Sequence, residues 1–308
     1  MNHLNSHRFG SGAAPTFLYD NLLAMYSLRR PDMTTAWTKA ALRGAIEGTV
    51  KTKYIFFDTN GVISLSSLVG DDYTTPSAET LATWAGTDTV LVKDWIGITS
   101  NNVVDSDLIL ESPEASEARN PILMVSGSIL LSNGKPTLSF QRTTIQEMTA
   151  KVQGLVGMDD LSAFSTMYVT ENKLATNTGK FLTNANSGGF YLHHDTSVGK
   201  IISTMPPSTI VYTSSQLTVD QQRIQLMTYT PVIPPTAASV KGYYNNLLQN
   251  TLTAYTSFDN EGIKVGGESL VPSEIFVGNI SEIIIMNEDV SGSYTSHFNE
   301  VNSYYETY

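Results

Sequence analysis

Short apolar runs, some of them alternating with polar residues, recur along the chain and predict β-strands separated by turns. Clear examples are residues 90–98, 223–229 and 280–286. We expect roughly a dozen such strands, because Gly, Pro, Asn and Asp lie between the runs. Asn133-Gly134 between two of them predicts a tight hairpin. This pattern favours an all-β antiparallel sandwich of the jelly-roll type.

Helical spacing occurs mainly at the two ends of the chain. Apolar residues at helical intervals predict a helix over residues 17–30, ended by Pro31, and a second short helix around residues 33–42. A terminal helix is expected over residues 296–305. We therefore predict a flexible N-terminal arm over residues 1–16 and a single jelly-roll domain over residues 17–308, with a few peripheral helices.

The late run at residues 280–286 is apolar on most of both faces. Alternation places Ile280, Ile284 and Met286 on one face together with Glu282, and it places Ser281, Ile283 and Ile285 on the other. A strand of this kind lies between two packed layers or under the helix that follows it.

Composition supports this interpretation and narrows the function. Charged residues make up only 15% of the 308 residues, whereas the chain has 32 Ser, 36 Thr and 20 Asn, which favour strands and turns over surface helices. The net charge of −11 argues against a partner made of nucleic acid and against an anionic membrane surface. Cysteine is absent, which excludes disulfides and thiolate chemistry. No signal peptide or membrane-spanning run is recognisable.

Candidate catalytic groups are sparse. Glycoside hydrolysis needs paired carboxylates, but Glu111, Glu114 and Glu117 have the pattern of a solvated loop, and Glu282 is a lone candidate. Adjacent His193 and His194 would face opposite sides of a strand, so at most one of them could join Asp195 in a metal site. We predict no catalytic residues and no enzymatic activity.

Two segments carry a family resemblance. The later one resembles the closing strand of concanavalin A-like or laminin G-like jelly rolls through Gly278, Ile280, Glu282, Ile283, Ile285 and Asn287. The earlier one, Ala24 with Tyr26-Ser27-Leu28-Arg29-Arg30, resembles the start of a jelly-roll module of bacteriophage virion proteins. That module is distantly similar to the catalytic domain of fungal α-L-arabinofuranosidases.

The order of further motifs adds to the resemblance. Along the chain follow Trp95-Ile96-Gly97-Ile98-Thr99-Ser100-Asn101-Asn102, then Asn120-Pro121-Ile122, then Asn133-Gly134-Lys135-Pro136. One position departs from the module, which usually has an acidic residue two places after the tryptophan. Gly97 stands there in this chain, so any site that uses that acid is missing here.

The resemblance implies a virion surface protein that is made in the host cytoplasm, as part of a tail, a baseplate or a capsid decoration. Its expected partners are other virion proteins, a homo-oligomer and a host surface glycan, with neither nucleic acid nor membrane. The alternatives are an arabinofuranosidase-like glycoside hydrolase and a purely structural shell or spike protein without a ligand.

Two groups of residues are candidate sites under this interpretation. Aromatic rings stack on sugars and amides hydrogen-bond to hydroxyls, so the densest such cluster, Tyr243, Tyr244, Asn245 and Asn246, is the candidate glycan site; core or edge packing is the other role open to these rings. No cofactor is expected. Because laminin G-like domains often hold Ca²⁺, Asp105 and Asp107 are candidate calcium ligands, as is the turn Asp259-Asn260-Glu261, although Asp and Asn are common in turns anyway.

Overall fold

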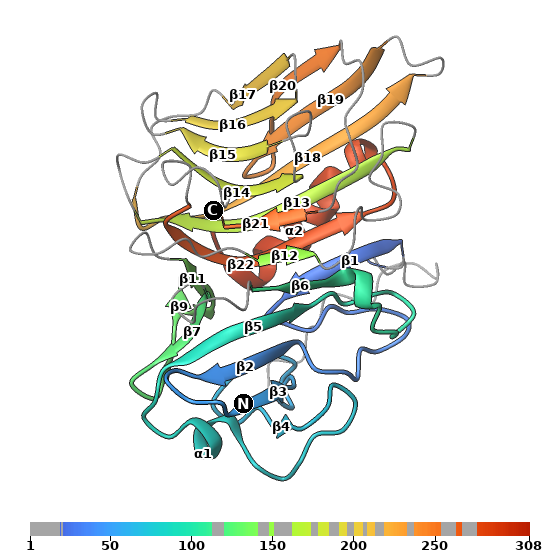
Figure 1. Cartoon of the computed structure of the whole chain (residues 1–308). Helices are drawn as coiled ribbons and strands as arrows, with labels where there is room; N and C mark the ends of the chain where they lie inside the picture. The colour runs from blue at the N-terminus through green and yellow to red at the C-terminus, as the bar shows by residue number, and fades with distance from the viewer. Residues whose placement is uncertain are drawn as a thin grey trace.

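The chain folds as an all-β sandwich of antiparallel strands, shown as a computed structural model in Figure 1. The structure describes residues 19, 21–112, 120–140, 148–150, 162–173, 178–184, 191–195, 200–205, 208–212, 219–232, 237–253, 263–266 and 276–308. Within these residues every strand pairing is antiparallel, which confirms the fold class expected from the alternating pattern.

Hydrogen-bonded neighbours define two layers of strands. The back layer has, in spatial order, β1 (Leu22–Ser27) and β11 (Leu138–Phe140) along one edge of β22 (Gly278–Met286), then β13 (Phe164–Asn172), β18 (Gln222–Val232), β19 (Ala237–Tyr244) and β20 (Leu247–Thr253). The front layer has β4 (Val69–Gly70), β3 (Thr52–Ile55), β2 (Leu42–Ile46), β5 (Val90–Ile96), β6 (Ile109–Glu111), β12 (Met148–Ala150), β21 (Ile263–Val265), β14 (Thr178–Asn184), β15 (Tyr191–Asp195), β16 (Lys200–Met205) and β17 (Ser208–Tyr212).

Short elements complete the fold. Strand β7 (Ile122–Val125) pairs with β5, β11 and β8 (Ser128–Ile129), and so joins the two layers. The predicted Asn133-Gly134 hairpin is confirmed as β9 (Leu131–Ser132) and β10 (Lys135–Pro136). The remaining elements are α1 (Leu81–Ala85), α2 (Tyr294–Tyr305) and the 3₁₀ turns η1 (Ser106–Leu108) and η4 (Val290–Gly292).

Two clusters of buried apolar side chains hold these parts together. The inner core lies between the layers and includes Trp95 of β5 and Tyr168 of β13. The outer core lies between the back layer and α2, and includes Phe298 and Val301 of the helix. The terminal helix is thus confirmed, and it covers the outer face of the back layer. No helix in the described part of the chain is long and apolar enough to cross a membrane.

Strand β22 is buried along its whole length because both of its faces are covered. Ile283 and Ile285 enter the inner core, whereas Ile284 and Met286 enter the outer core, as the alternation predicted. The prediction for Ile280 was wrong, because this side chain lies in the inner core. Opposite β13 the register shifts between residues 280 and 282, and such a β-bulge reverses the facing of the residues beyond it.

The two helices predicted near the N-terminus are absent from the described residues there. Residues 22–27 form β1, which pairs with β22, and residues 33–41 form no regular helix. Met25 lies in the outer core and Tyr26 in the inner core, so both faces of β1 are buried. A strand that is apolar on both faces imitates helical spacing over such a short length.

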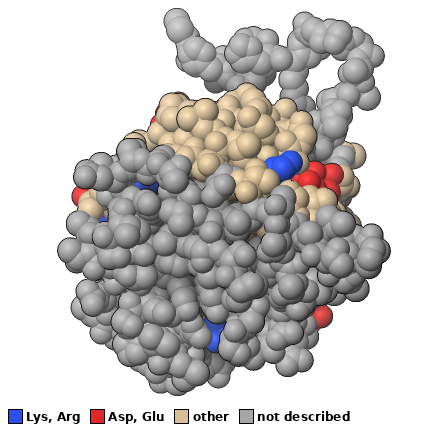
Figure 2. All heavy atoms as spheres, turned by 90° about the horizontal axis from the view of Figure 1, so that it is seen from above, with Lys and Arg blue, Asp and Glu red and all other residues tan. Residues whose placement is uncertain are grey.

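The low content of charged residues is visible on the surface. Figure 2 views the molecule from above, and the described atoms on this face are mostly uncharged, with Lys, Arg, Asp and Glu side chains in small groups.

Candidate functional site

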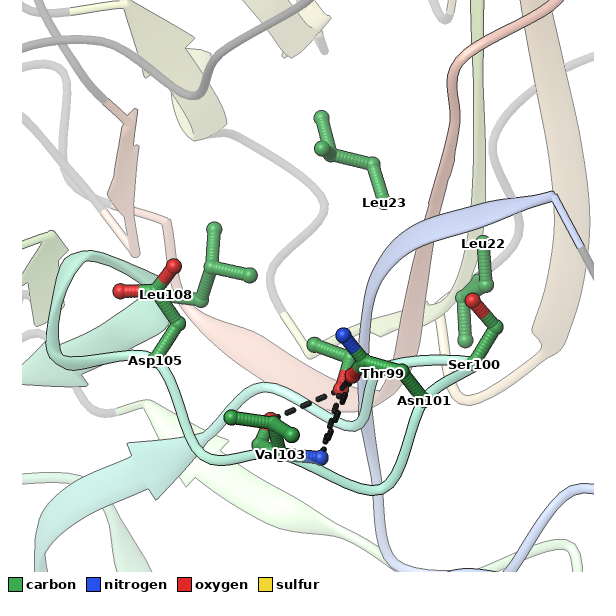
Figure 3. A pocket seen from close by; sticks show the side chains of 8 residues that line it. All are labelled: Leu22, Leu23, Thr99, Ser100, Asn101, Val103, Asp105 and Leu108. Atoms are coloured by element: carbon green, nitrogen blue, oxygen red, sulfur yellow. Dashed lines mark hydrogen bonds between the residues drawn. The ribbon is translucent and has the colours of Figure 1, made fainter. Parts of the chain in front are cut away.

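An open pocket of about 230 Å³ lies where the start of β1 meets the loop after β5. Its lining is shared between apolar and polar side chains: Leu22, Leu23, Thr99, Ser100, Asn101, Val103, Asp105 and Leu108 (Figure 3). We call it the loop pocket. The sequence pointed to this loop through Asp105, but it gave no sign that β1 would form the opposite wall.

Backbone contacts fix the loop against β1. Ile98 and Met25 exchange a pair of backbone hydrogen bonds at 2.8 and 2.9 Å, which joins the two walls of the loop pocket. Gly97 donates its N–H to the carbonyl oxygen of Leu108 at 2.9 Å. A Cβ atom at position 97 would lie 2.6 Å from that oxygen, so the close approach requires glycine.

Side-chain hydrogen bonds shape the rim. The hydroxyl of Thr99 lies 2.7 Å from Oδ1 of Asn101 and 2.8 Å from the carbonyl oxygen of Val103. Figure 3 shows these contacts within the loop, with the carboxylate of Asp105 on the opposite side of the pocket. The side chain of Val103 is 54% exposed. The pocket therefore offers a hydroxyl, an amide and one carboxylate beside an apolar surface.

The two candidate calcium ligands lie close in sequence but differ in role. The carboxylate of Asp105 caps η1 by accepting the N–H of Asp107 at 3.0 Å, and it lines the loop pocket. The carboxylate of Asp107 accepts the hydroxyl of Ser106 at 3.3 Å and does not line the pocket. Among the described residues no three His, Cys, Asp or Glu side chains come together as a metal site. Calcium binding here stays a prediction.

A buried tyrosine lies beneath the same loop. The hydroxyl of Tyr26 and the indole N–H of Trp95 are both buried and find no hydrogen-bond partner among the described residues, and the two rings meet edge to face at 6.0 Å. Burial raises the pKa of Tyr26, and the carboxylate of Asp105 adds to that rise. Tyr26 is therefore neutral and keeps its proton as a hydrogen-bond donor.

The predicted glycan cluster lies at the β19–β20 hairpin, and its two rings face opposite sides of the back layer. Tyr243 is 2% exposed and packs on Tyr294 of α2, with ring centroids 4.4 Å apart. Burial raises the pKa of Tyr243 to about 12. The half-buried Tyr244 packs against the inner core and hydrogen-bonds to Arg223. The rings therefore do not form one platform, and a glycan contact by this cluster stays a prediction.

Asn245 and Asn246 form the turn of this hairpin. Both have left-handed backbones, with φ of 43° and 65°, which asparagine tolerates better than most residues. The Oδ1 of Asn245 accepts the N–H of Ile224 at 3.2 Å. Their presence is thus explained by turn geometry.

The lone candidate carboxylate, Glu282, belongs to a buried ion cluster that the sequence did not reveal. The Nε of Arg29 lies 3.0 Å from Oε1 of Glu282, and its Nη1 lies 2.7 Å from Oε1 of Glu300 on α2. Ser27 also donates to Glu282 at 2.8 Å, and Tyr19 hydrogen-bonds to Glu300. Pairing between β1 and β22 and the docking of α2 together bring these groups into contact.

The two carboxylates of this cluster differ in their acidity. Burial raises the pKa of Glu282, although Arg29 opposes the rise. Burial acts in the same direction on Glu300, but there the guanidinium of Arg29 outweighs it and leaves the pKa below its ordinary value. Neither carboxylate lines the loop pocket, so the cluster ties β1, β22 and α2 together.

Several other predicted features fall outside the described residues. These are the N-terminal arm at residues 1–16, Glu114, Glu117 and the turn Asp259-Asn260-Glu261. Glu111 ends β6, and His193, His194 and Asp195 lie on β15, of which only the backbone is described.

Comparisons with known proteins bear on the fold. No family model and no curated protein sequence matches the chain. A solved GH54 α-L-arabinofuranosidase, soaked with a cyclic sulfate inhibitor, is similar with a TM-score of 0.59 and 13% identity, over 93% of this chain and 62% of that one. An arabinofuranosidase complexed with arabinofuranosyl-α-1,2-xylobiose is similar with a TM-score of 0.54 and 12% identity, over 90% of this chain and 62% of that one. The chain thus spans less than two thirds of either enzyme, and the likeness confirms the expected sandwich fold.

Proposed function

We propose that the protein is a non-catalytic surface component of a bacteriophage particle, which uses its sandwich for assembly and for contact with a glycan of the host. The order of the phage-module motifs along the chain supports a location on a bacteriophage particle. The segment that resembles the phage module and the one that resembles the closing strand of concanavalin A-like jelly rolls pair side by side in the fold, since Ser27 of β1 lies opposite Glu282 of β22.

The loop pocket is the observation that carries the glycan contact. Sugars present hydroxyls and apolar C–H faces, and this pocket places hydrogen-bonding side chains such as Asn101 and Asp105 beside the apolar Val103 and Leu23. Among the described residues that line it, the only charged group is the carboxylate of Asp105, and the whole chain carries a net charge of −11. We therefore expect neutral glycans to bind in preference to glycans that contain carboxylates or sulfates.

Binding of labelled neutral and acidic oligosaccharides to the intact protein tests this proposal. Asn101→Ala and Val103→Ser should weaken binding of the neutral sugars several-fold, because each removes one kind of contact. Asp71→Asn, at a side chain that is 89% exposed and remote in sequence from the loop, is the matched control. Equal binding by all variants, or a preference for acidic glycans, would contradict the assignment of this pocket.

The proposed location on a bacteriophage particle requires its own test. Mass spectrometry of purified particles, followed by localisation with labelled antibody, should find the protein on the particle surface. Absence from every particle preparation would contradict the virion role, whatever the glycan assay shows. A flat glycan array together with an ordered lattice on the particle would instead support a purely structural shell or spike protein.

The second candidate function is glycoside hydrolysis of the arabinofuranosidase type, which the likeness in fold favours. Such catalysis uses two carboxylates that flank one sugar, at separations of roughly 5–10 Å. The loop pocket contributes one carboxylate, and Glu282 is engaged by Arg29 in the buried cluster. Release of reducing sugar from arabinose-containing substrates would favour the enzyme over the binding protein.

A further inference from the structure

A second pocket, of about 160 Å³, lies at the C-terminal end of α2. All of its lining residues are polar: Asn133, Asp220, Gln221, Gln222, Glu306 and Thr307. We call it the helix-end pocket. It shares no residue with the loop pocket or with the predicted glycan cluster.

The turn of the β9–β10 hairpin holds this pocket against the helix. The Nδ2 of Asn133 donates to the carbonyl oxygen of Tyr305 at 2.6 Å and to that of Glu306 at 3.1 Å. Glu306 ends α2 with a left-handed backbone, and its N–H bonds to the carbonyl oxygen of Asn302 at 2.8 Å. The pocket thus opens at a helix C-terminus, where backbone carbonyls concentrate partial negative charge.

The charged side chains of the lining are both acidic. Lys173 lies 2.8 Å from Oδ1 of Asp220, and it also pairs with Glu171, so this lysine is held beside the pocket by two carboxylates. The exposed carboxylate of Glu306 makes no ion pair with any residue in the described part of the chain. The lining therefore keeps an excess of negative charge.

Gln222 supplies an independent sign that a hydrogen-bond donor is missing. This residue is 4% exposed. Its Nε2 donates to the hydroxyl of Ser281 at 3.0 Å, and that hydroxyl lies 3.0 Å from the hydroxyl of Thr137. These contacts engage Nε2 of the amide, and Oε1 is buried without a hydrogen-bond partner among the described residues. A buried acceptor that lacks a donor is unfavourable, so a donor supplied at this pocket would stabilise it.

We propose that the helix-end pocket receives the guanidinium group of an arginine side chain from a protein partner. A guanidinium carries several N–H donors in one plane and a permanent positive charge, so it can serve Gln222, Glu306 and the helix carbonyls together. A directly coordinated calcium ion would need six or more oxygens within roughly 2.3–2.6 Å, and the ammonium of Lys173 would repel it from Asp220. This inference does not depend on the proposed glycan contact.

Titration of the full chain with arginine amide, followed by NMR of the Gln222 side-chain amide, tests the proposal. We expect saturable shifts with arginine amide and none with citrulline amide, which has the same α-amino group but an uncharged isosteric side chain. Glu306→Gln should raise the dissociation constant by roughly twofold to fivefold, the factor that an exposed ion pair contributes. Glu47→Gln, at an exposed carboxylate elsewhere, should leave the constant unchanged.

Three results would overturn the proposal. These are the absence of saturable shifts with arginine amide, an equal response to citrulline amide, and saturable shifts with Ca²⁺ alone in place of arginine amide. Because Glu306 is exposed and has no ion pair among the described residues, its substitution should not prevent folding; an unchanged spectrum outside the pocket verifies this.

Discussion

The guanidinium of Arg29 bonds to the buried carboxylate of Glu282, with Nε 3.0 Å from Oε1. This contact joins two segments that are 253 residues apart in the sequence. The same guanidinium reaches Glu300 on α2. One side chain therefore links the segment that follows β1, strand β22 of the back layer and the terminal helix.

We predict that Arg29→Met destabilises the fold by about 3–5 kcal/mol, because it leaves Glu282 charged, buried and unpaired. The midpoint and slope of urea unfolding measure this change. Lys53→Met is the matched control, because its partner Asp71 is 89% exposed and such surface pairs contribute at most about 1 kcal/mol. Equal losses in the two variants would show that the buried pair has no special weight.

Position 97 provides a test of the loop pocket's construction. Gly97→Ala places a Cβ 2.6 Å from the carbonyl oxygen of Leu108, and we expect a loss of about 1–3 kcal/mol together with displacement of the loop. Gly292→Ala in η4 meets no atom within 4 Å and should be nearly neutral. The free energy of unfolding of both variants, measured by urea unfolding, tests this prediction. If Gly97→Ala is as stable as the unsubstituted protein, the close packing of Gly97 against Leu108 is contradicted.

Burial of His297 gives stability a pH dependence. Burial lowers the pKa of His297 below its ordinary value of 6.5, against the opposing charges of Glu288 and Glu300. The unfolded chain then binds a proton near pH 6.5 that the folded chain does not, so the free energy of unfolding falls as the pH drops from 6.5 to the folded pKa. In His297→Gln this part of the slope should disappear. An NMR titration that places the pKa of His297 at or above 6.5 would contradict the prediction.

The ring of Tyr243 should contribute to the stability of the fold because it is buried. Tyr243→Ala removes a buried ring beneath α2, and we expect a loss of about 3–5 kcal/mol. Leu247→Ala in the same hairpin, at a residue that is 65% exposed, should change stability by less than about 0.5 kcal/mol. If Tyr243→Ala unfolds at the same urea concentration as the Leu247→Ala control, the ring of Tyr243 is not part of the outer core.

That comparison also bears on adsorption to a host. A loss of adsorption in Tyr243→Ala with lowered stability reflects packing, whereas Tyr244→Ala tests a contact more directly because its ring is only half-buried. Measuring adsorption and urea unfolding on the same preparations separates the two causes.

The sequence predicted several strands and the terminal helix correctly, but it did not predict strand β1. Strand β5, the β9–β10 hairpin, β22 and α2 follow from local alternation, turn residues and helical spacing. Strand β1 was mistaken for a helix, because two covered faces give Leu22, Met25 and Tyr26 the spacing of a helical stripe. The facing of Ile280 depends on a bulge, and no local pattern in the chain marks that bulge.

The sites were harder to predict than the strands. Asp105 was singled out because the resemblance to laminin G-like domains suggested calcium ligands in its loop, but the opposite wall of the pocket comes from β1, some 80 residues away in sequence. The buried Arg29–Glu282–Glu300 cluster depends on strand pairing and helix docking together. Contacts between distant segments leave little trace in local periodicity.

The position of strand β22 late in the chain delays assembly of the back layer during synthesis. This strand pairs with β1 and β11 along one edge and with β13 along the other. All three of these strands precede it in the sequence, because β22 is formed by residues 278–286. Until the ribosome has made residues 278–286, the earlier strands of the back layer lack the neighbour that joins them. The nascent chain must therefore keep apolar strand edges apart until β22 emerges, and slow translation or a chaperone at that stage should raise the yield of folded protein.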